Sequence, residues 1–102
     1  GLNPFYEAPT LLIVFADKNV ATYVQDGSAV IMNMLNAAFS LGVDSCWIHR
    51  AKETFETDFG KELMQKWGLD ENYEGIGNIV LGYRDCPLPP AAPRKKNYII
   101  FD

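Results

Sequence analysis

The sequence has few cysteines, a single histidine and no excess of positive charge. The two cysteines, Cys46 and Cys86, have no CxxC spacing and too few companions for a zinc site. We expect two free thiols, with Cys46 acting as a small buried hydrophobe in an apolar strand. Thirteen acidic residues against nine basic ones give a net charge of -4, which argues against a binder of nucleic acid or of anionic membranes.

Long hydrophobic runs are also missing. The longest, such as Leu11 to Ala16 and Ala29 to Met32, fall far short of the roughly 20 residues that span a bilayer, so we expect no membrane segment. The opening residues GLNPFYEAPT have neither the basic start nor the apolar centre of a signal peptide, so we expect a cytoplasmic location. The length predicts a single domain over residues 1–102, with a small core that a partner subunit can extend.

The motifs of common catalytic machineries are absent as well. The sequence has no GxSxG, no HExxH, no GxxxxGK[ST] and no GxGxxG opening a helix after a strand. The glycine-rich stretch GIGNIVLG, residues 75–82, has the interior of a strand at its centre and is not a phosphate loop. We therefore expect no catalytic side chain and no metal site.

Strand patterns recur along the chain. Leu11 to Ala16, LLIVFA, is apolar without alternation and follows Pro9, which predicts a central strand covered on both faces. Further strands are predicted at Asp44 to Ile48, at Gly75 to Tyr83 and at Asn97 to Phe101. The last of these needs a sheet edge to join. The glycines of the third strand predict a bulge or a close approach of backbones.

Two helical regions separate these strands. Tyr23 to Leu41 is apolar nearly all round, which predicts a helix inside the protein or against another subunit, and Gly42 supplies a left-handed stop. Glu53 to Trp67 is predicted to be helical, with a break near Thr57 to Gly60 and an end at Gly68. Its predicted inward residues are Phe55, Phe59, Leu63, Met64 and Trp67. Two helical regions are not enough to cover both faces of a sheet. We therefore expect another chain, or a part of the protein absent here, to cover the rest of the sheet.

Two groups of polar residues are candidates for a site. His49 and Arg50 follow the strand that ends at Ile48, and the carboxyl ends of strands are where ligands bind in open sheets. Alternatively, they only mark the exit of the chain into solvent, and the neighbouring Trp47 is a core residue. Arg94 and Lys96 share a face of an extended segment, an arrangement that suits a phosphate.

Alternatively, these basic residues form a solvated cluster that keeps an edge strand from pairing with other sheets, and composition alone favours this interpretation. The basic residues follow the segment Cys86 to Pro93, which holds four prolines in eight residues. That segment is predicted to be an extended connector.

Several stretches together resemble the C-terminal part of the nitroreductase family of FMN-dependent NAD(P)H oxidoreductases. They are NPFYEAPTLLIVFAD (3–17), DGSAVIMNMLNAAFSLGVDSCWI (26–48), LGY (81–83) and PPAAPRKKN (89–97). The resemblance implies an α+β fold in α/β/α layers, with a mixed β-sheet flanked by helices. It implies that the fold is incomplete here and completed by the partner in an intertwined homodimer. It also implies that the family's usual N-terminal FMN-binding segment lies outside this chain.

The resemblance assigns two sets of residues to the cofactor FMN. Trp47, Ile48, His49 and Arg50 would lie along the flavin ring, and Arg94 and Lys96 would bind the phosphate. The implied activity is hydride transfer from NAD(P)H to nitroaromatic or quinone-type acceptors, carried by FMN without a catalytic side chain. The alternative is a truncated, cofactor-free dimerisation module without activity.

Overall fold

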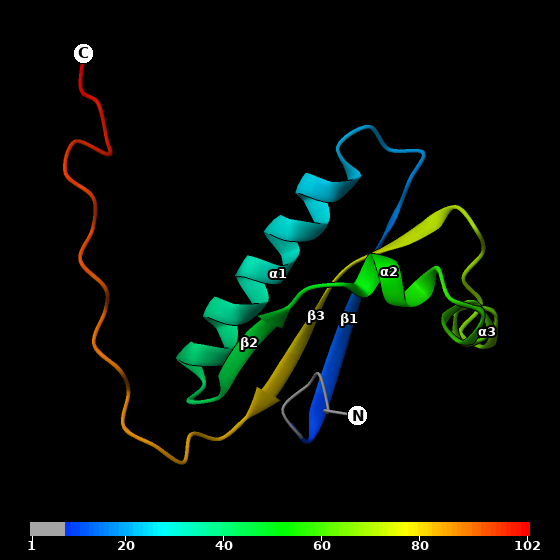
Figure 1. Cartoon of the computed structure of the whole chain (residues 1–102), viewed down its shortest axis with the longest axis horizontal. Helices are drawn as coiled ribbons and strands as arrows, with labels where there is room; N and C mark the ends of the chain where they lie inside the picture. The colour runs from blue at the N-terminus through cyan, green and yellow to red at the C-terminus, as the bar shows by residue number, and fades with distance from the viewer. Residues whose placement is uncertain (1–7) are drawn as a thin grey trace.

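A computed structural model describes residues 8–102 of the chain, and expectations that fall on residues 1–7 lie outside the described part. The elements in chain order are β1 (Thr10–Asp17), α1 (Tyr23–Ser40), β2 (Asp44–Ile48), α2 (Ala51–Phe55), α3 (Asp58–Lys66) and β3 (Tyr73–Gly82). Figure 1 shows α1 lying along the sheet and the chain leaving β3 as a long C-terminal tail, residues 83–102.

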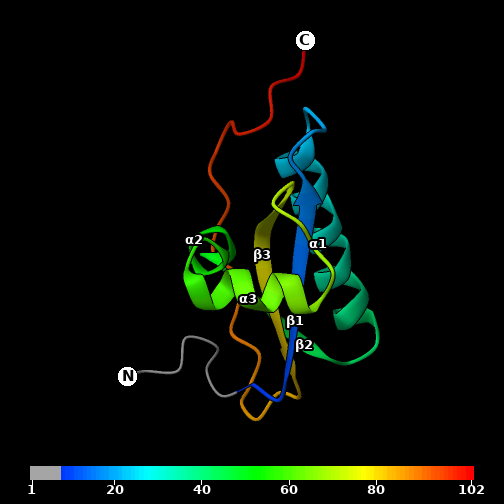
Figure 2. The same cartoon turned by 90° about the vertical axis from the view of Figure 1, so that its right-hand side faces the viewer.

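The described strands form one sheet in the order β1-β3-β2, and both neighbouring pairs are antiparallel. Figure 2 shows α1 on one face of this sheet and α2 with α3 on the other. The predicted α+β class in α/β/α layers is confirmed. The prediction that Leu11 to Ala16 is a central strand is wrong, because β3 is central and β1 lies at the edge of the described sheet. Helices lie on both sides of β1, so Leu12 to Asp17 are half-buried despite the open edge, whereas Thr10 and Leu11 are exposed.

Helix α1 confirms the predicted helix to within one residue at its end, and Gly42 has the left-handed φ of +76° that the stop requires. The inner side of α1 packs on the sheet through Ile31, which is fully buried, and through Gly27, which lies against Ile76. The outer side is open within this chain. Large apolar residues on this side of α1 and just beyond its two ends are 46–78% exposed. They are Val20, Val24, Val30, Met32, Phe39 and Leu41.

The opposite face of the sheet carries the hydrophobic cluster of Ala51, Phe55 and Met64, with Ile13 and Phe15 of β1 packed against it. The rings of Phe15 and Phe55 meet edge to face with centroids 4.9 Å apart. Two predicted inward residues do not join the buried cluster. Phe59 is 68% exposed and points outward, and Trp67 is 47% exposed although its ring lies beside those of Phe15 and Phe55.

The predicted break in the second helical region is confirmed. Thr57 separates α2 from α3, and its hydroxyl accepts a hydrogen bond from the backbone N–H of Gly60 at 3.1 Å. Gly60 fits closely against the backbone of Thr54, where a side chain would have no room. The two short helices therefore form a bend, and the region begins at Ala51, two residues before the predicted start.

The glycines of β3 have the predicted structural roles. The register between β1 and β3 shifts between Val14 and Phe15, because Ile76 of β3 has no partner in the ladder. Gly75 lies against the backbone of Ala51. These close approaches bring α2 down onto the central strand.

The tail has no helix or strand, so the predicted strand at Asn97 to Phe101 is wrong for this chain by itself. Ile100 and Phe101 are 89% and 90% exposed, which means that no sheet edge of the same chain receives them. The prediction of a buried Cys46 is wrong as well, because both Cys46 and Cys86 are exposed, and both are free thiols as expected. Cys46 lies on β2, which is an edge strand of the described sheet.

Candidate functional site

The junction between β2 and α2 places the first group of predicted site residues together. Trp47 and Ile48 end β2, and His49 and Arg50 form the exposed link to α2. Arg50 has φ +77° and ψ 20°, the left-handed conformation, which costs a non-glycine residue about 1 kcal/mol. The next residue, Ala51, is fully buried against β3, so the chain turns sharply at Arg50. The junction therefore combines a sharp turn of the backbone with two exposed polar side chains.

The side chain of Trp47 is anchored beneath this junction. Its Nε1 lies over Gly77, where an added Cβ would be only 2.5 Å from that nitrogen and 2.7 Å from Cδ1 of Ile31. Trp47 Nε1 is buried and has no hydrogen-bond partner among the described residues, although a buried donor of this kind usually has one. The indole ring therefore holds the end of β2 against β3 and α1. The ring of His49 lies 6.1 Å from it, tilted by 35°.

The second predicted group lies on the tail. Arg94 Nη1 donates a hydrogen bond to the carbonyl oxygen of Ala92 at 2.8 Å, and Lys95 Nζ lies 5.9 Å from the ring centre of Tyr98. Lys96 is exposed and precedes Asn97, whose φ is +57°. Figure 1 shows the tail running apart from α2, so the chain by itself does not bring these cations to the β2 to α2 junction.

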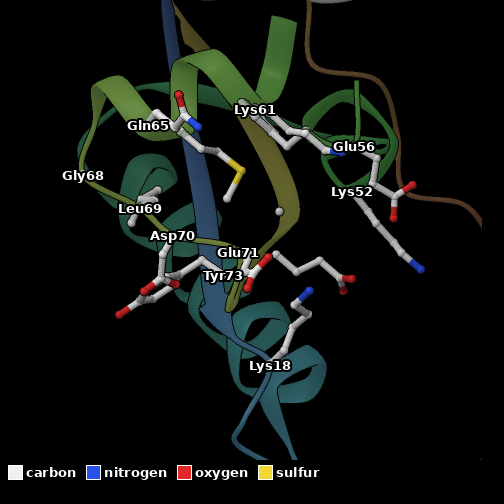
Figure 3. A pocket seen from close by; sticks show the side chains of 14 residues that line it. Lys18, Lys52, Glu56, Lys61, Gln65, Gly68, Leu69, Asp70, Glu71 and Tyr73 are labelled. Carbon is white, nitrogen blue, oxygen red and sulfur yellow. The ribbon is translucent and has the colours of Figure 1, made fainter. Parts of the chain in front are cut away.

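A cavity of about 800 Å³ lies in the angle between α2, α3 and the start of β3, and sequence reasoning missed it. Its apolar lining includes Phe55, Met64 and Leu69. Figure 3 shows Lys18, Lys52 and Glu56 along one side and Asp70 on the other. Three lysines and four carboxylates line the cavity, so charges of both signs are mixed and neither sign dominates the lining strongly. None of the predicted site residues lines it.

Glu74, which lines this cavity, shifts the pKa of Tyr23. A hydrogen bond to the Glu74 carboxylate raises the pKa of Tyr23 above its ordinary value of 10.0, and desolvation and the negative charge of Glu74 act in the same direction.

Neither a metal centre nor a membrane segment is found in the described part of the chain. No group of three or more His, Cys, Asp or Glu residues within residues 8–102 is placed to hold a metal ion. No helix in the same residues is long and apolar enough to cross a membrane.

Comparison with known proteins gives one consistent result. The sequence profile of the Nitroreductase family matches residues 2–83. A nitroreductase with bound FMN from Bacteroides fragilis NCTC 9343 matches with a TM-score of 0.86 and 30% identity over 99% of this chain and 55% of that chain. A nitroreductase with bound FMN from Desulfitobacterium hafniense DCB-2 has a TM-score of 0.81 and 23% identity, over 97% of this chain and 54% of its own.

A third structure is described as a putative NADH dehydrogenase/NAD(P)H nitroreductase from Bacteroides thetaiotaomicron VPI-5482. It matches with a TM-score of 0.72 and 26% identity over 94% of this chain and 56% of its own. The chain thus spans about half the length of these solved structures. Among proteins with curated functions, none matches.

Proposed function

This chain belongs to the nitroreductase family, and from that membership we propose that it is part of a flavoprotein oxidoreductase with FMN as its cofactor. The proposed reaction is hydride transfer from NAD(P)H to a nitroaromatic or quinone-type acceptor. The observation that supports this most strongly is the match of nearly the whole chain to a nitroreductase with bound FMN. The absence of a catalytic motif agrees with it, because FMN supplies the redox chemistry when it is bound.

The β2 to α2 junction is the proposed border of the flavin ring. We assign Trp47, Ile48, His49 and Arg50 to this role. His49 and Arg50 are exposed, and the buried Ala51 and the anchored Trp47 on either side fix their backbone. A rigid surface of this kind can hold a planar ring in one orientation. Because Trp47 Nε1 is covered by Gly77 and Ile31, we assign Trp47 to positioning the strand end rather than to donating a hydrogen bond from its side chain.

Arg94 and Lys96 are assigned to the FMN phosphate. Both are exposed cations, and a guanidinium and an ammonium are suitable partners for a phosphate dianion. The tail carries them away from the junction of their own chain, so we propose that they act across the subunit boundary of a homodimer. The open apolar side of α1 and the exposed apolar end of the tail support a second copy of the chain as the partner.

The test is FMN binding and reduction by the purified protein. We expect the visible absorbance of bound flavin, its bleaching by NADPH or NADH, and recovery of the colour when a quinone is added. The cytoplasm, which supplies NAD(P)H, is the proposed location. A protein that gains no flavin absorbance when FMN is added would refute the proposal.

Replacement of Arg94 and Lys96 by Ala tests the phosphate assignment. We expect the Kd for FMN to rise by about tenfold or more, because each tenfold step corresponds to about 1.4 kcal/mol and a charge-assisted hydrogen bond contributes that much or more. The matched control is the double replacement of Lys61 and Lys66 by Ala, which removes the same charge from α3. Equal Kd values for the two variants would exclude Arg94 and Lys96 from the phosphate site.

A second candidate function is a dimerisation module without cofactor. The exposed apolar residues of α1 and of the tail favour it, because such surfaces are typical of interfaces. Sedimentation equilibrium, together with the flavin absorbance of the same sample, separates the two proposals. A dimer that never binds FMN supports the module, and a dimer that binds FMN supports the oxidoreductase.

A further inference from the structure

The point where the tail leaves the sheet is held by an ion pair. Arg84 follows the end of β3, and Asp44 is the first residue of β2, whose Cα partner in the ladder is Gly82. Arg84 Nε donates to Asp44 Oδ2 at 3.0 Å, and Arg84 Nη2 donates to Asp44 Oδ1 at 3.3 Å. Among residues 8–102 it is the one salt bridge between side chains.

Its geometry favours orientation over stability. The two side chains are 33% and 37% exposed, and pairs at such exposure add little to folding stability. Two hydrogen bonds between one guanidinium and one carboxylate do fix a direction, which a lysine ammonium would not. The pair therefore restrains the angle between the start of the tail and the edge of the sheet.

Because of the composition of the tail, the angle at Arg84 affects where residues further along the tail lie. Prolines at four of the eight positions from Cys86 to Pro93 stiffen the chain beyond Arg84. At about 3.1 Å per residue in an extended proline-rich chain, the ten residues from Arg84 to Arg94 span about 31 Å. If the segment were straight over that length, a change of about 20° in its direction at Arg84 would displace Arg94 by roughly 11 Å.

A second contact surface lies beside the ion pair. Leu88 and Pro89 of the tail, together with Leu35 and Phe39 of α1, line a groove of about 440 Å³ whose wall includes Asp44 and Arg84. Leu88 and Phe39 are 62% and 65% exposed, so this apolar contact is open and restrains the tail weakly. The ion pair is the directional part of the attachment.

We propose that the Arg84–Asp44 pair is a positioning clamp that sets where the tail presents Arg94 and Lys96. This proposal rests on the proposed function, because it takes Arg94 and Lys96 to bind the FMN phosphate. Arg84 and Asp44 do not touch the cofactor; they act through the direction of the tail. If release of the clamp leaves the tail in the competent direction for a fifth to a tenth of the time, the apparent Kd for FMN rises about five- to tenfold.

The first readout is the direction of the tail, which is independent of FMN. In a background with Cys46→Ser and Cys86→Ser, spin labels are attached at Gln25→Cys on α1 and at Lys95→Cys on the tail. Labelled chains are diluted into unlabelled chains so that each dimer holds one labelled copy. The distribution of label distances is then measured by pulsed electron resonance for the parent and for Arg84→Ala, Asp44→Ala and Arg84→Lys.

Two further variants complete the set. The exchanged pair Asp44→Arg with Arg84→Asp restores the contact with reversed charges, and Lys66→Ala removes one charge elsewhere as the matched control. We expect a narrow distribution for the parent, the exchanged pair and the control. We expect a broad distribution for Arg84→Ala, Asp44→Ala and Arg84→Lys. Arg84→Lys belongs to this group because a lysine ammonium cannot make two hydrogen bonds to one carboxylate in the fixed geometry of a guanidinium.

The second readout is the Kd for FMN, measured by the quenching of flavin fluorescence on the same proteins. It should rise five- to tenfold in the variants with a broad distribution and return toward the parent value in the exchanged pair. A narrow distribution in Arg84→Ala, or a broad one in the parent, overturns the clamp. A broad distribution with unchanged FMN affinity overturns its link to the phosphate. If the parent itself binds no FMN, the proposed function fails, and the label distances still confirm or overturn the clamp.

Discussion

Gly77 lies under the anchored Trp47, and a methyl group at this position tests how the β2 to α2 junction is held. In Gly77→Ala the new Cβ would lie 2.5 Å from Trp47 Nε1 and 2.7 Å from Ile31 Cδ1, far inside van der Waals contact. Ile31 is fully buried, so its side chain has little free space into which it can move. The added atom therefore forces Trp47, and with it the end of β2, away from β3.

The magnitude follows from two opposing effects. Overpacking of this kind costs about 1–3 kcal/mol. Replacing glycine by alanine also restricts the unfolded chain, which stabilises the protein by about 0.4–1 kcal/mol. The free energy of unfolding should fall by about 1–2 kcal/mol. Gly82→Ala is the matched control on the same strand, because its Cβ would have an ordinary contact of 3.7 Å with Pro9, and we expect it to be neutral or slightly stabilising.

Urea unfolding followed by tryptophan fluorescence measures both variants, with the free energy obtained by linear extrapolation. The Kd for FMN should rise in Gly77→Ala, because His49 and Arg50 follow the displaced strand end. A Gly77→Ala protein that unfolds at the same urea concentration as Gly82→Ala would show that Trp47 is not packed on Gly77. The anchoring of the junction would then need another explanation.

Two further predictions concern the stability of the chain. Hydrogen bonding to Glu74 raises the pKa of Tyr23, so the stability that this group contributes is fully present below pH 10.0 and is lost as the pH rises through the folded-state pKa. Urea unfolding at a series of pH values above 10.0 should therefore show a smaller loss of stability for Tyr23→Phe than for the parent. An equal alkaline slope in both proteins would contradict the contact. Phe55→Ala should lower the free energy of unfolding by about 3–5 kcal/mol, since Phe55 is 7% exposed in the core. Phe59→Ala, at a residue that is 68% exposed, should change it by at most about 0.5 kcal/mol, and comparable losses in thermal unfolding would place Phe59 in a core.

Local signals allowed the elements themselves to be predicted from the sequence. Asp44 to Ile48 was recognisable as a strand, and Gly42 and Thr57 were recognisable as the end of one helix and the break in another. The position of β1 within the sheet was not predictable in the same way. An apolar run without alternation indicates that layers cover both faces of a strand, and that is true of an edge strand between helices as well as of a central one.

The errors at Asn97 to Phe101, Phe59 and Cys46 have a common cause. Each prediction took apolar character as a sign of packing, and in the structure the apolar side chains of Asn97 to Phe101, Phe59 and Cys46 are exposed. Burial is decided by what packs from elsewhere, and hydrophobicity alone does not report it.

The candidate site was only partly within reach of sequence reasoning. His49 and Arg50 were singled out because they follow a strand, and the structure does place them on an exposed junction. The left-handed backbone of Arg50 was not foreseeable, because the residue usual in that conformation is glycine. The cavity beside α2 and α3 was missed because Lys18, Lys52 and Asp70 come from separate segments that share no motif.

The conformation of Arg50 also limits which sequences this fold can accept at one position. Selection at residue 50 acts first on the main chain, since glycine, asparagine and aspartate tolerate a φ of +77° and β-branched residues do not. A library randomised here and sorted only for folded protein should therefore drift toward glycine. Sorting the same library for turnover would reveal whether the guanidinium compensates for a torsion angle that disfavours it.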